Sequence, residues 1–314
     1  MIPLKVNGFR MNESKRMDIR VERLHPTFAA RVTGVDLREP LDAATVAEIV
    51  AAMDRYAVCA FPHPEPLTNE QHIAFSRHLG PMQPTPILKV TGQVKLHKRV
   101  PYTEIINVSN LDENGNLFDE SHRTTMFRRA DQQWHSDVSF NDNRATYSAL
   151  SAHIVPPGGD TEYADMRSAY AALPPSMKEK IAGLVAEHSV WYSKMRVGFP
   201  EPTEEELRSA PPAQHPLVHE RAGRTSLYVA SHASHIIGMP VDEGRALLAE
   251  LIDFATQPQF VHRHAWTVGD VVIWDNLAVM HRAPAFADLR VPRELRRTTM
   301  RERPFTEAAD LGMN

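Results

Sequence analysis

Hydrophobic and polar residues follow two different periods in the first part of the chain. In residues 29–37 (AARVTGVDL) apolar side chains recur at every second position, which predicts a β-strand. Residues 44–56 (ATVAEIVAAMDRY) follow Asp42, a good helix N-cap, and carry apolar residues at helical spacing. The run YAVCAF (residues 56–61) returns to strand character, and a second helix is predicted over residues 69–79. Gly80 suits the left-handed position after that helix, and Pro81 follows it directly.

The pattern becomes polar and irregular between residues 81 and 129, with segments such as GQVKLHKR, DENGN and ESHRTT. We therefore expect a long excursion with little regular structure of its own. Long excursions of this kind are often lids or binding loops. The sequence thus predicts a lid-like region over about residues 81–129.

Short β-rich runs separated by turns dominate the rest of the chain. Helical patterns interrupt them at residues 166–172, continuing past Pro175, and at residues 242–256. Many short strands with inserted helices favour a mainly β fold, a double-stranded β-helix (jelly roll) core with helical decoration. A doubly wound parallel sheet is the main alternative, but regular strand–helix alternation is missing. The predicted strands are YSALSAHIV (147–155), SLYVA (226–230), QFVHRHAW (259–266), GDVVIWDN (269–276) and RRTTM (296–300).

Composition and charge fit a soluble globular protein. Hydrophobic residues make up 42% and charged residues 24% of the 314 residues, and no repeat or low-complexity linker divides them, so we expect residues 1–314 to form a single domain. A net charge of −4 gives no field that would attract nucleic acid or an anionic membrane. The first residues lack the apolar stretch of a secretory signal, which predicts a cytoplasmic protein. The single cysteine, Cys59, lies in an apolar run and is expected to be buried and inert.

The residues that suggest chemistry are His135 and Asp137, two positions apart in QQWHSDVSF. In an extended strand, residues i and i+2 project from the same face, so this imidazole and carboxylate can converge on one ion. By itself the pair more often makes an ordinary hydrogen bond. A third candidate, His281, follows the apolar run VVIW and a turn at Asp275 and Asn276. Two histidines and one carboxylate, with the opposite face of the metal open, are typical of iron(II) oxygenases.

Four segments resemble the TauD/TfdA family of Fe(II)/2-oxoglutarate-dependent dioxygenases, and the resemblance extends over almost the whole chain. A further segment, residues 230–266, is similar in form to the branch typified by the 2,4-dichlorophenoxyacetate dioxygenase. The resemblance implies a jelly roll that uses Fe(II), 2-oxoglutarate as cosubstrate and O₂. The four segments are WHSDVSF (134–140), PPGGDTEYADMRSAYAALP (156–174), GDVVIWDNLAVMHRAP (269–284) and RELRRTTM (293–300).

The resemblance also implies roles for individual residues. His135, Asp137 and His281 become the iron ligands, and Thr161 and Arg293 would hold the distal carboxylate of 2-oxoglutarate. Arg297 would lie near the carboxylate next to the metal. Arginine suits this task because its planar fork binds a carboxylate with two hydrogen bonds. In a strand, Arg293 and Arg297 share one face, and Arg296 should face away; the spacing from His281 leaves Arg296 as an alternative to Arg293.

The predicted substrate is a small anion. Lys89 and Lys98, in the irregular region, match lysines that receive the substrate carboxylate in the phenoxyacetate-degrading branch. Trp134, Tyr102, Tyr192, Lys194 and Arg196 are further candidates for the pocket wall. The resemblance implies hydroxylation of an aryloxyalkanoate, with ether cleavage to a phenol and glyoxylate, and relatives that commonly form homo-oligomers.

Three alternatives stay open at this point. The substrate could be a sulfonate, a sulfate ester or another small carboxylate. The same three ligands could hold zinc and support hydrolysis, although that reaction needs a general base that the sequence does not identify. The fold could also serve as a binding protein without catalysis, but such a protein has no reason to retain all three ligands together with Thr161, Arg293 and Arg297.

Overall fold

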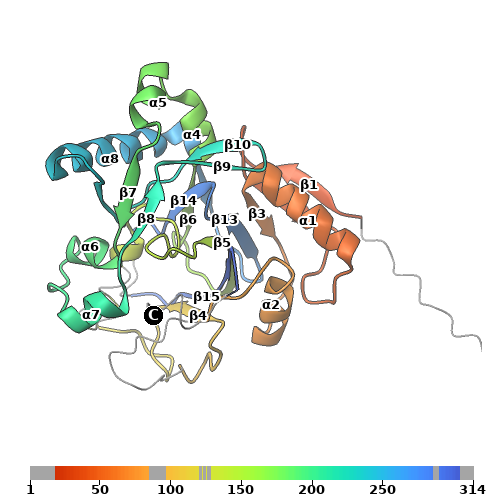
Figure 1. Cartoon of the computed structure of the whole chain (residues 1–314). Helices are drawn as coiled ribbons and strands as arrows, with labels where there is room; N and C mark the ends of the chain where they lie inside the picture. Colours follow the sequence, from red (N-terminus) through yellow and green to blue (C-terminus); the bar gives the residue numbers. More distant parts are fainter. Residues whose placement is uncertain are drawn as a thin grey trace, which may run out of the picture.

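The larger of two facing sheets forms the centre of the molecule (Figure 1). The structure is a computed structural model that describes residues 18–84, 97–119, 122, 125, 129–285 and 290–304. Within these residues the larger sheet has the strand order β1-β2-β3-β13-β5-β15-β4, and only β2 and β3 run parallel. The strands are β1 (Arg20–Arg23), β2 (Ala30–Thr33), β3 (Val58–Phe61), β4 (Ile106–Ser109), β5 (Ala145–Ile154), β13 (Val271–Asp275) and β15 (Glu294–Arg301).

The second sheet contains β12 (Val261–His264), β6 (Thr161–Asp165) and β14 (Val279–Arg282), all antiparallel. Side chains from both sheets meet in one hydrophobic core, in which Leu150, Trp274 and Leu295 of the larger sheet pack with Tyr163 and Val279 of the smaller one. This arrangement confirms the predicted jelly roll, and the alternative of a doubly wound parallel sheet is wrong.

Two helices cover the outer face of the larger sheet, α1 (Ala43–Tyr56) and α2 (Asn69–Ser76). The Asp42 side chain accepts a hydrogen bond from the backbone N of Thr45, which confirms the predicted N-cap of α1. The predicted end of α2 is wrong by three residues, because the helix stops at Ser76. Gly80 does have a positive φ, of 147°, but in the loop that follows rather than next to the helix.

A further layer packs against the smaller sheet (Figure 1). Its main helix, α8 (Val241–Ala255), begins one residue before the predicted start and buries Leu247 and Leu251. The sequence pattern missed most of the short strands of this layer because four residues are too few to show a period. The remaining elements are α4 (Met166–Ala172), α5 (Pro175–Ile181), α6 (Val190–Met195), α7 (Glu204–Ser209), the short 3-10 helix Pro258–Phe260, and the strands β7 (Val185–His188), β8 (Ala213–Pro216), β9 (Val218–Arg221), β10 (Arg224–Leu227) and β11 (Ala233–Ile236).

The predicted irregular excursion contains regular structure that the pattern did not indicate. Within it, β4 pairs with β15, and Val100 and Ile105 pack on Ile73 of α2. The described part of the excursion is therefore fastened to both the larger sheet and α2. Residues 85–96, which include Lys89, lie outside the described residues.

Cys59 is fully buried in β3, and burial raises the pKa of its thiol, as expected for an inert core cysteine. In the described part of the chain, no helix is both long enough and apolar enough to cross a bilayer.

Several buried histidines make the fold sensitive to acid. Burial lowers the pKa of His72 to about 3, from an ordinary value of 6.5, and lowers that of His188 well below the ordinary value. These imidazoles stay neutral in the folded protein, whereas the unfolded chain takes up their protons below pH 6.5. Each such histidine therefore contributes stability that is present above pH 6.5, and about 1.4 kcal/mol of it is lost for every pH unit below that value.

We predict that the free energy of unfolding of the metal-free protein falls steeply between pH 6.5 and pH 4. Urea titrations across this range should show that the His72→Gln variant takes up about one proton fewer on unfolding than the wild type. His78→Gln, at an exposed histidine of the same region, is the matched control for the loss of an imidazole. A pH-independent stability of the wild type over this range would contradict the prediction.

Candidate metal centre

Two distant segments meet at the candidate metal centre through a single backbone pair. The N–H of His135 donates to the carbonyl of His281 at 3.0 Å, and the N–H of His281 donates to the carbonyl of His135 at 2.8 Å. His281 lies in β14, after a turn that follows β13, as the sequence predicted. The prediction of a strand around QQWHSDVSF is wrong: beyond the bridge at His135 the chain enters a turn at Asp137, and Val138 has a φ of 57°.

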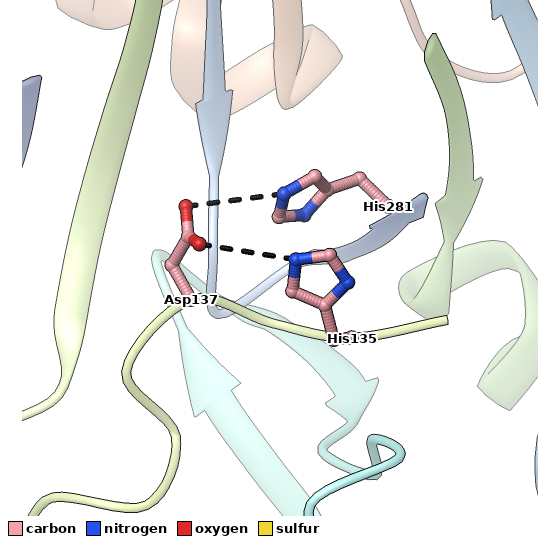
Figure 2. A group of neighbouring side chains, drawn as sticks. All are labelled: His135, Asp137 and His281. Atoms are coloured by element: carbon pink, nitrogen blue, oxygen red, sulfur yellow. Dashed lines mark ion pairs between the residues drawn. The ribbon is translucent and has the colours of Figure 1, made fainter. Parts of the chain in front are cut away.

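The turn nevertheless brings Asp137 to the same side as the two imidazoles (Figure 2). Nε2 of His135 lies 4.0 Å from Oδ1 of Asp137, and Nε2 of His281 lies 3.9 Å from Oδ2. The two imidazole centroids are 4.2 Å apart, and one nitrogen or oxygen of each residue lies within 4.8 Å of the others. All three residues are at most 7% exposed. The predicted ligands are thus collected in one buried group of the size that a metal ion requires.

Hydrogen bonds and packing orient the three side chains. Nδ1 of His135 lies 2.8 Å from the carbonyl of Gln133, so Nδ1 carries the hydrogen and the lone pair of Nε2 points toward Asp137. The His281 ring packs against Trp274, with centroids 4.6 Å apart. A donor set of two imidazoles and one carboxylate on one side fits Fe(II).

Charges near the centre favour protonation states that bind metal. Burial alone would raise the pKa of Asp137, but the Arg297 guanidinium and the two imidazoles lower it to about 2. Nη1 of Arg297 donates to Oδ1 of Asp137 at 2.5 Å. Burial also holds the pKa of His281 well below its ordinary value. At neutral pH the site therefore offers a charged carboxylate and a neutral His281, so neither has to lose a proton when a cation binds.

A buried amide that the sequence analysis did not identify connects the two segments. Asn276 is 1% exposed, and its Oδ1 accepts hydrogen bonds from Trp274 Nε1 at 2.9 Å and from the backbone N of Asp137 at 3.2 Å. Its Nδ2 donates to Ser148 Oγ at 2.9 Å, and Ser148 Oγ in turn donates to Asp137 Oδ2 at 2.7 Å. Asn276 therefore fixes both the backbone and, through Ser148, the carboxylate of Asp137. Its position in the turn WDN was the only sequence signal.

The residues expected to hold 2-oxoglutarate come from both sheets, at the start of β6 and in and just before β15. Thr161 begins β6 and is 3% exposed, and its Oγ1 accepts a hydrogen bond from Trp266 Nε1 at 3.0 Å. Arg293 directly precedes β15 and is 6% exposed, and its Nε donates to the carbonyl of Gly159 at 3.0 Å. A Cβ at Gly159 would lie only 3.2 Å from the Arg293 side chain, so the glycine permits this close approach.

Alternation along β15 separates the arginines as the sequence predicted. Arg297 points inward to Asp137, and its buried Nε has no hydrogen-bond acceptor among the described residues. Arg296 points outward and bonds Glu294 at 2.8 Å and Asn69 of α2 at 2.9 Å. Arg296 is thus engaged on the face of β15 opposite to the metal centre, which favours Arg293 as the second inward arginine.

The predicted substrate-binding and pocket-wall residues are more scattered. The Lys98 side chain is 74% exposed and pairs with Glu113 at 3.4 Å, and Tyr102 donates a hydrogen bond to Glu70 of α2. The guanidinium of Arg282 lies 4.6 Å from the centroid of the Trp134 ring, next to the ligand His135.

On α6, the guanidinium groups of Arg245 and Arg196 lie 5.1 and 5.8 Å from the centroid of the Tyr192 ring. Lys194, on the same helix, is 8% exposed. Of the lysines proposed for the pocket and described by the structure, Lys194 is therefore the buried one.

Loss of the Asn276 amide should weaken metal binding without unfolding the protein. We predict that Asn276→Ala lowers the affinity for Mn(II) roughly 10- to 100-fold, the usual effect of removing a group that orients a ligand. Calorimetric titration of the metal-free protein measures this directly. Asn143→Ala is the matched control, because Asn143 is equally buried but bonds the backbone of Arg303. Equal Mn(II) affinities of the two variants would refute the positioning role of Asn276.

The amino-acid sequence is similar to those of several named dioxygenases. The chain is 43% identical to an alpha-ketoglutarate-dependent 2,4-dichlorophenoxyacetate dioxygenase of Cupriavidus pinatubonensis, over 90% of this chain and 98% of the relative. It is 36% identical to an (S)-phenoxypropionate/alpha-ketoglutarate-dioxygenase of Sphingobium herbicidovorans, over 83% of this chain and 87% of the relative.

A solved structure and a family model also match this chain. The crystal structure of AAD-2 in complex with Mn(II) and N-oxalylglycine superposes with a TM-score of 0.82 at 39% identity, covering 92% of this chain and 99% of AAD-2. Residues 20–299 match the family model described as taurine catabolism dioxygenase TauD, TfdA family. The chain therefore belongs to the TauD/TfdA family of dioxygenases.

Proposed function

We propose that this protein is an Fe(II)- and 2-oxoglutarate-dependent dioxygenase that hydroxylates a small aryloxyalkanoate. The observation that carries the proposal is the buried group of His135, Asp137 and His281, with the inward-facing Arg297 beside it. The relatives that act on 2,4-dichlorophenoxyacetate and (S)-phenoxypropionate support the substrate class. Alpha-ketoglutarate, in their names, is 2-oxoglutarate.

One group of site residues would bind the metal, and a second group would bind the cosubstrate. His135, Asp137 and His281 would hold Fe(II) through the two Nε2 atoms and the carboxylate. Thr161 and Arg293 would bind the distal carboxylate of 2-oxoglutarate, and Arg297 would lie beside the carboxylate next to the metal. The buried Nε hydrogen of Arg297, which has no acceptor among the described residues, fits a carboxylate of this kind.

When bound, Fe(II), 2-oxoglutarate and O₂ supply the oxidation, in which 2-oxoglutarate is converted to succinate and CO₂ and a C–H bond of the substrate is hydroxylated. The protein contributes placement and exclusion of water. Burial of the three ligands, each at most 7% exposed, keeps the reacting region dry, and Ser148 and Asn276 hold the Asp137 carboxylate in one orientation.

Hydroxylation next to the ether oxygen explains how an aryloxyacetate would be cleaved. The new hydroxyl group and the ether oxygen share one carbon, so the product is a hemiacetal. The hemiacetal breaks its C–O bond to the aryl oxygen, the hydroxyl proton passes to that oxygen, and a phenol and glyoxylate result. The protein therefore needs no hydrolytic residue for ether cleavage.

The set of residues around the ligands argues against the two other classes. A zinc hydrolase would have no use for Thr161, Arg293 and Arg297 as a dicarboxylate site. A binding protein without catalysis would gain nothing from placing a buried carboxylate between two imidazoles, since burying a charge is costly. The presence of both groups of residues therefore favours the dioxygenase.

Assays of product formation test the proposed function. With Fe(II), 2-oxoglutarate and air, 2,4-dichlorophenoxyacetate should give 2,4-dichlorophenol, glyoxylate and succinate in equal amounts. His281→Ala should abolish all three products while the circular dichroism spectrum stays that of a folded protein. A panel with a sulfonate, an alkyl sulfate ester and a simple carboxylate tests the alternative substrates. Faster succinate release with one of these than with any aryloxyalkanoate would overturn the substrate class, and release of succinate with none would overturn the activity.

A further inference from the structure

The hydroxyl group of Thr161, at the start of β6, accepts a hydrogen bond from an indole. Nε1 of Trp266 donates to Thr161 Oγ1 at 3.0 Å. An indole N–H is a donor only, so chemistry alone fixes the direction of this bond. The hydroxyl hydrogen of Thr161 must therefore point away from Trp266.

This hydroxyl hydrogen has no acceptor among the described residues. Thr161 is 3% exposed, and within the described part of the chain its hydroxyl bonds Trp266 alone. A hydroxyl oxygen carries one hydrogen and two lone pairs, so the bond from Trp266 uses a lone pair and leaves the hydrogen available. A buried donor without an acceptor costs free energy. The Thr161 hydroxyl is therefore prepared to donate to a ligand.

Packing holds the Trp266 indole beside Thr161. Trp266 lies between β12 and β13, and its ring packs, partly buried, against the core between the two sheets. The His264 ring meets the indole edge to face, with centroids 4.6 Å apart and an interplanar angle of 83°. His264 lies directly opposite Thr161 in the antiparallel pair of β12 and β6. The cross-strand neighbour of Thr161 therefore supports the indole that bonds it.

Asp270, which is 8% exposed, fastens the chain on both sides of Trp266. Its Oδ2 accepts a hydrogen bond from the backbone N of Thr267 at 2.9 Å and lies 3.1 Å from Nε2 of His264. The N–H of Asp270 donates back to the carbonyl of Thr267 at 3.0 Å, and its carbonyl accepts from the N–H of Ala152 in β5 at 2.9 Å. The position of the indole is thus tied to the larger sheet.

We propose that Trp266 is a positioning residue for the cosubstrate, because its N–H occupies a lone pair of Thr161 and turns the hydroxyl hydrogen toward the distal carboxylate of 2-oxoglutarate. The inference rests on the proposed function, in which Thr161 and Arg293 bind that carboxylate. Trp266 acts through Thr161 rather than on the cosubstrate itself. A hydroxyl that accepts one hydrogen bond is also a stronger donor, since hydrogen bonds in a chain polarise one another.

Binding of 2-oxoglutarate without turnover tests this role. Trp266→Phe keeps an aromatic ring beside His264 but removes the N–H donor. In calorimetric titrations without O₂, on protein that holds Mn(II), this variant should raise the Kd of 2-oxoglutarate roughly 3- to 10-fold, the range expected for one hydrogen bond. The affinity for Mn(II) should stay unchanged. Asp270→Ala, which leaves the indole but removes the carboxylate that fastens its neighbours, should raise the same Kd by a smaller factor.

Three controls separate positioning from a general change of packing. 2-Oxobutyrate has the same keto and carboxylate groups for the metal but no distal carboxylate, so its Kd should be equal for the wild type and Trp266→Phe. In a Thr161→Val background, Trp266→Phe should not change the Kd of 2-oxoglutarate further, because the hydroxyl that it orients is gone. Trp191→Phe is the matched variant and should leave the Kd unchanged, since the buried Nε1 of Trp191 has no partner among the described residues. Thermal unfolding shows that each variant is folded.

The outcomes separate the positioning role from the proposed function. An unchanged Kd of 2-oxoglutarate in Trp266→Phe, an equal loss of affinity for 2-oxobutyrate, or a further loss in the Thr161→Val background overturns the role of Trp266 alone. Binding of 2-oxoglutarate that depends on Trp266 and Thr161 together, without turnover of any aryloxyalkanoate, sulfonate or sulfate ester in air with Fe(II), supports the role and overturns the proposed function. A wild-type protein that binds no 2-oxoglutarate overturns both.

Discussion

The metal centre depends on the reciprocal pair of backbone hydrogen bonds between His135 and His281. These two residues belong to segments far apart in the sequence. The pair holds the segments in register through backbone atoms alone, without a contribution from side chains. Once the bridge is made, the two imidazoles lie 4.2 Å apart on one side, and the turn after His135 delivers Asp137 to them.

The second constraint is the buried charge of Asp137, which is stabilised by hydrogen bonds from the surrounding polar groups. A carboxylate that is 3% exposed would be costly without partners. Arg297 and Ser148 each donate to one carboxylate oxygen, and Asn276 holds both Ser148 and the Asp137 backbone. The same arrangement keeps the carboxylate charged and points it at the two imidazoles. The stability of this part of the fold and its capacity to bind a cation therefore have one origin.

The sequence predicted the elements whose signal is local. The apolar run of β13, the turn after it and His281 were read correctly, because a buried strand and an Asp-Asn turn each leave a pattern of their own. His135 and Asp137 were identified through a strand that does not exist, and they converge because the chain turns at Asp137. The end of α2 and β4 were mispredicted, since both are decided by contacts with the rest of the molecule: α2 packs on β15, and β4 exists through its pairing with β15.

Features that depend on contacts between distant segments could not be predicted. Asn276 acts through Ser148, 128 residues away in the sequence, and nothing in either neighbourhood indicates the other. The burial of Lys194 depends in the same way on how α6 packs, and nothing in its own segment of the sequence distinguishes it from the exposed Lys98. The roles of Thr161, Arg293 and Arg297 came from the family resemblance alone. The structure places Thr161 at the start of β6 and Arg297 on β15, with Arg293 directly before that strand.

The most direct measurement of the central claim is the visible absorption spectrum of the protein without O₂ as Fe(II) and then 2-oxoglutarate are added. If His135, Asp137 and His281 hold the iron while 2-oxoglutarate chelates it, a charge-transfer band in the middle of the visible range should develop and saturate at one equivalent of each. The band should be absent from His281→Ala under the same conditions. A wild-type protein that binds Fe(II) but gives no band with 2-oxoglutarate, or a His281→Ala variant that gives the full band, would contradict the account.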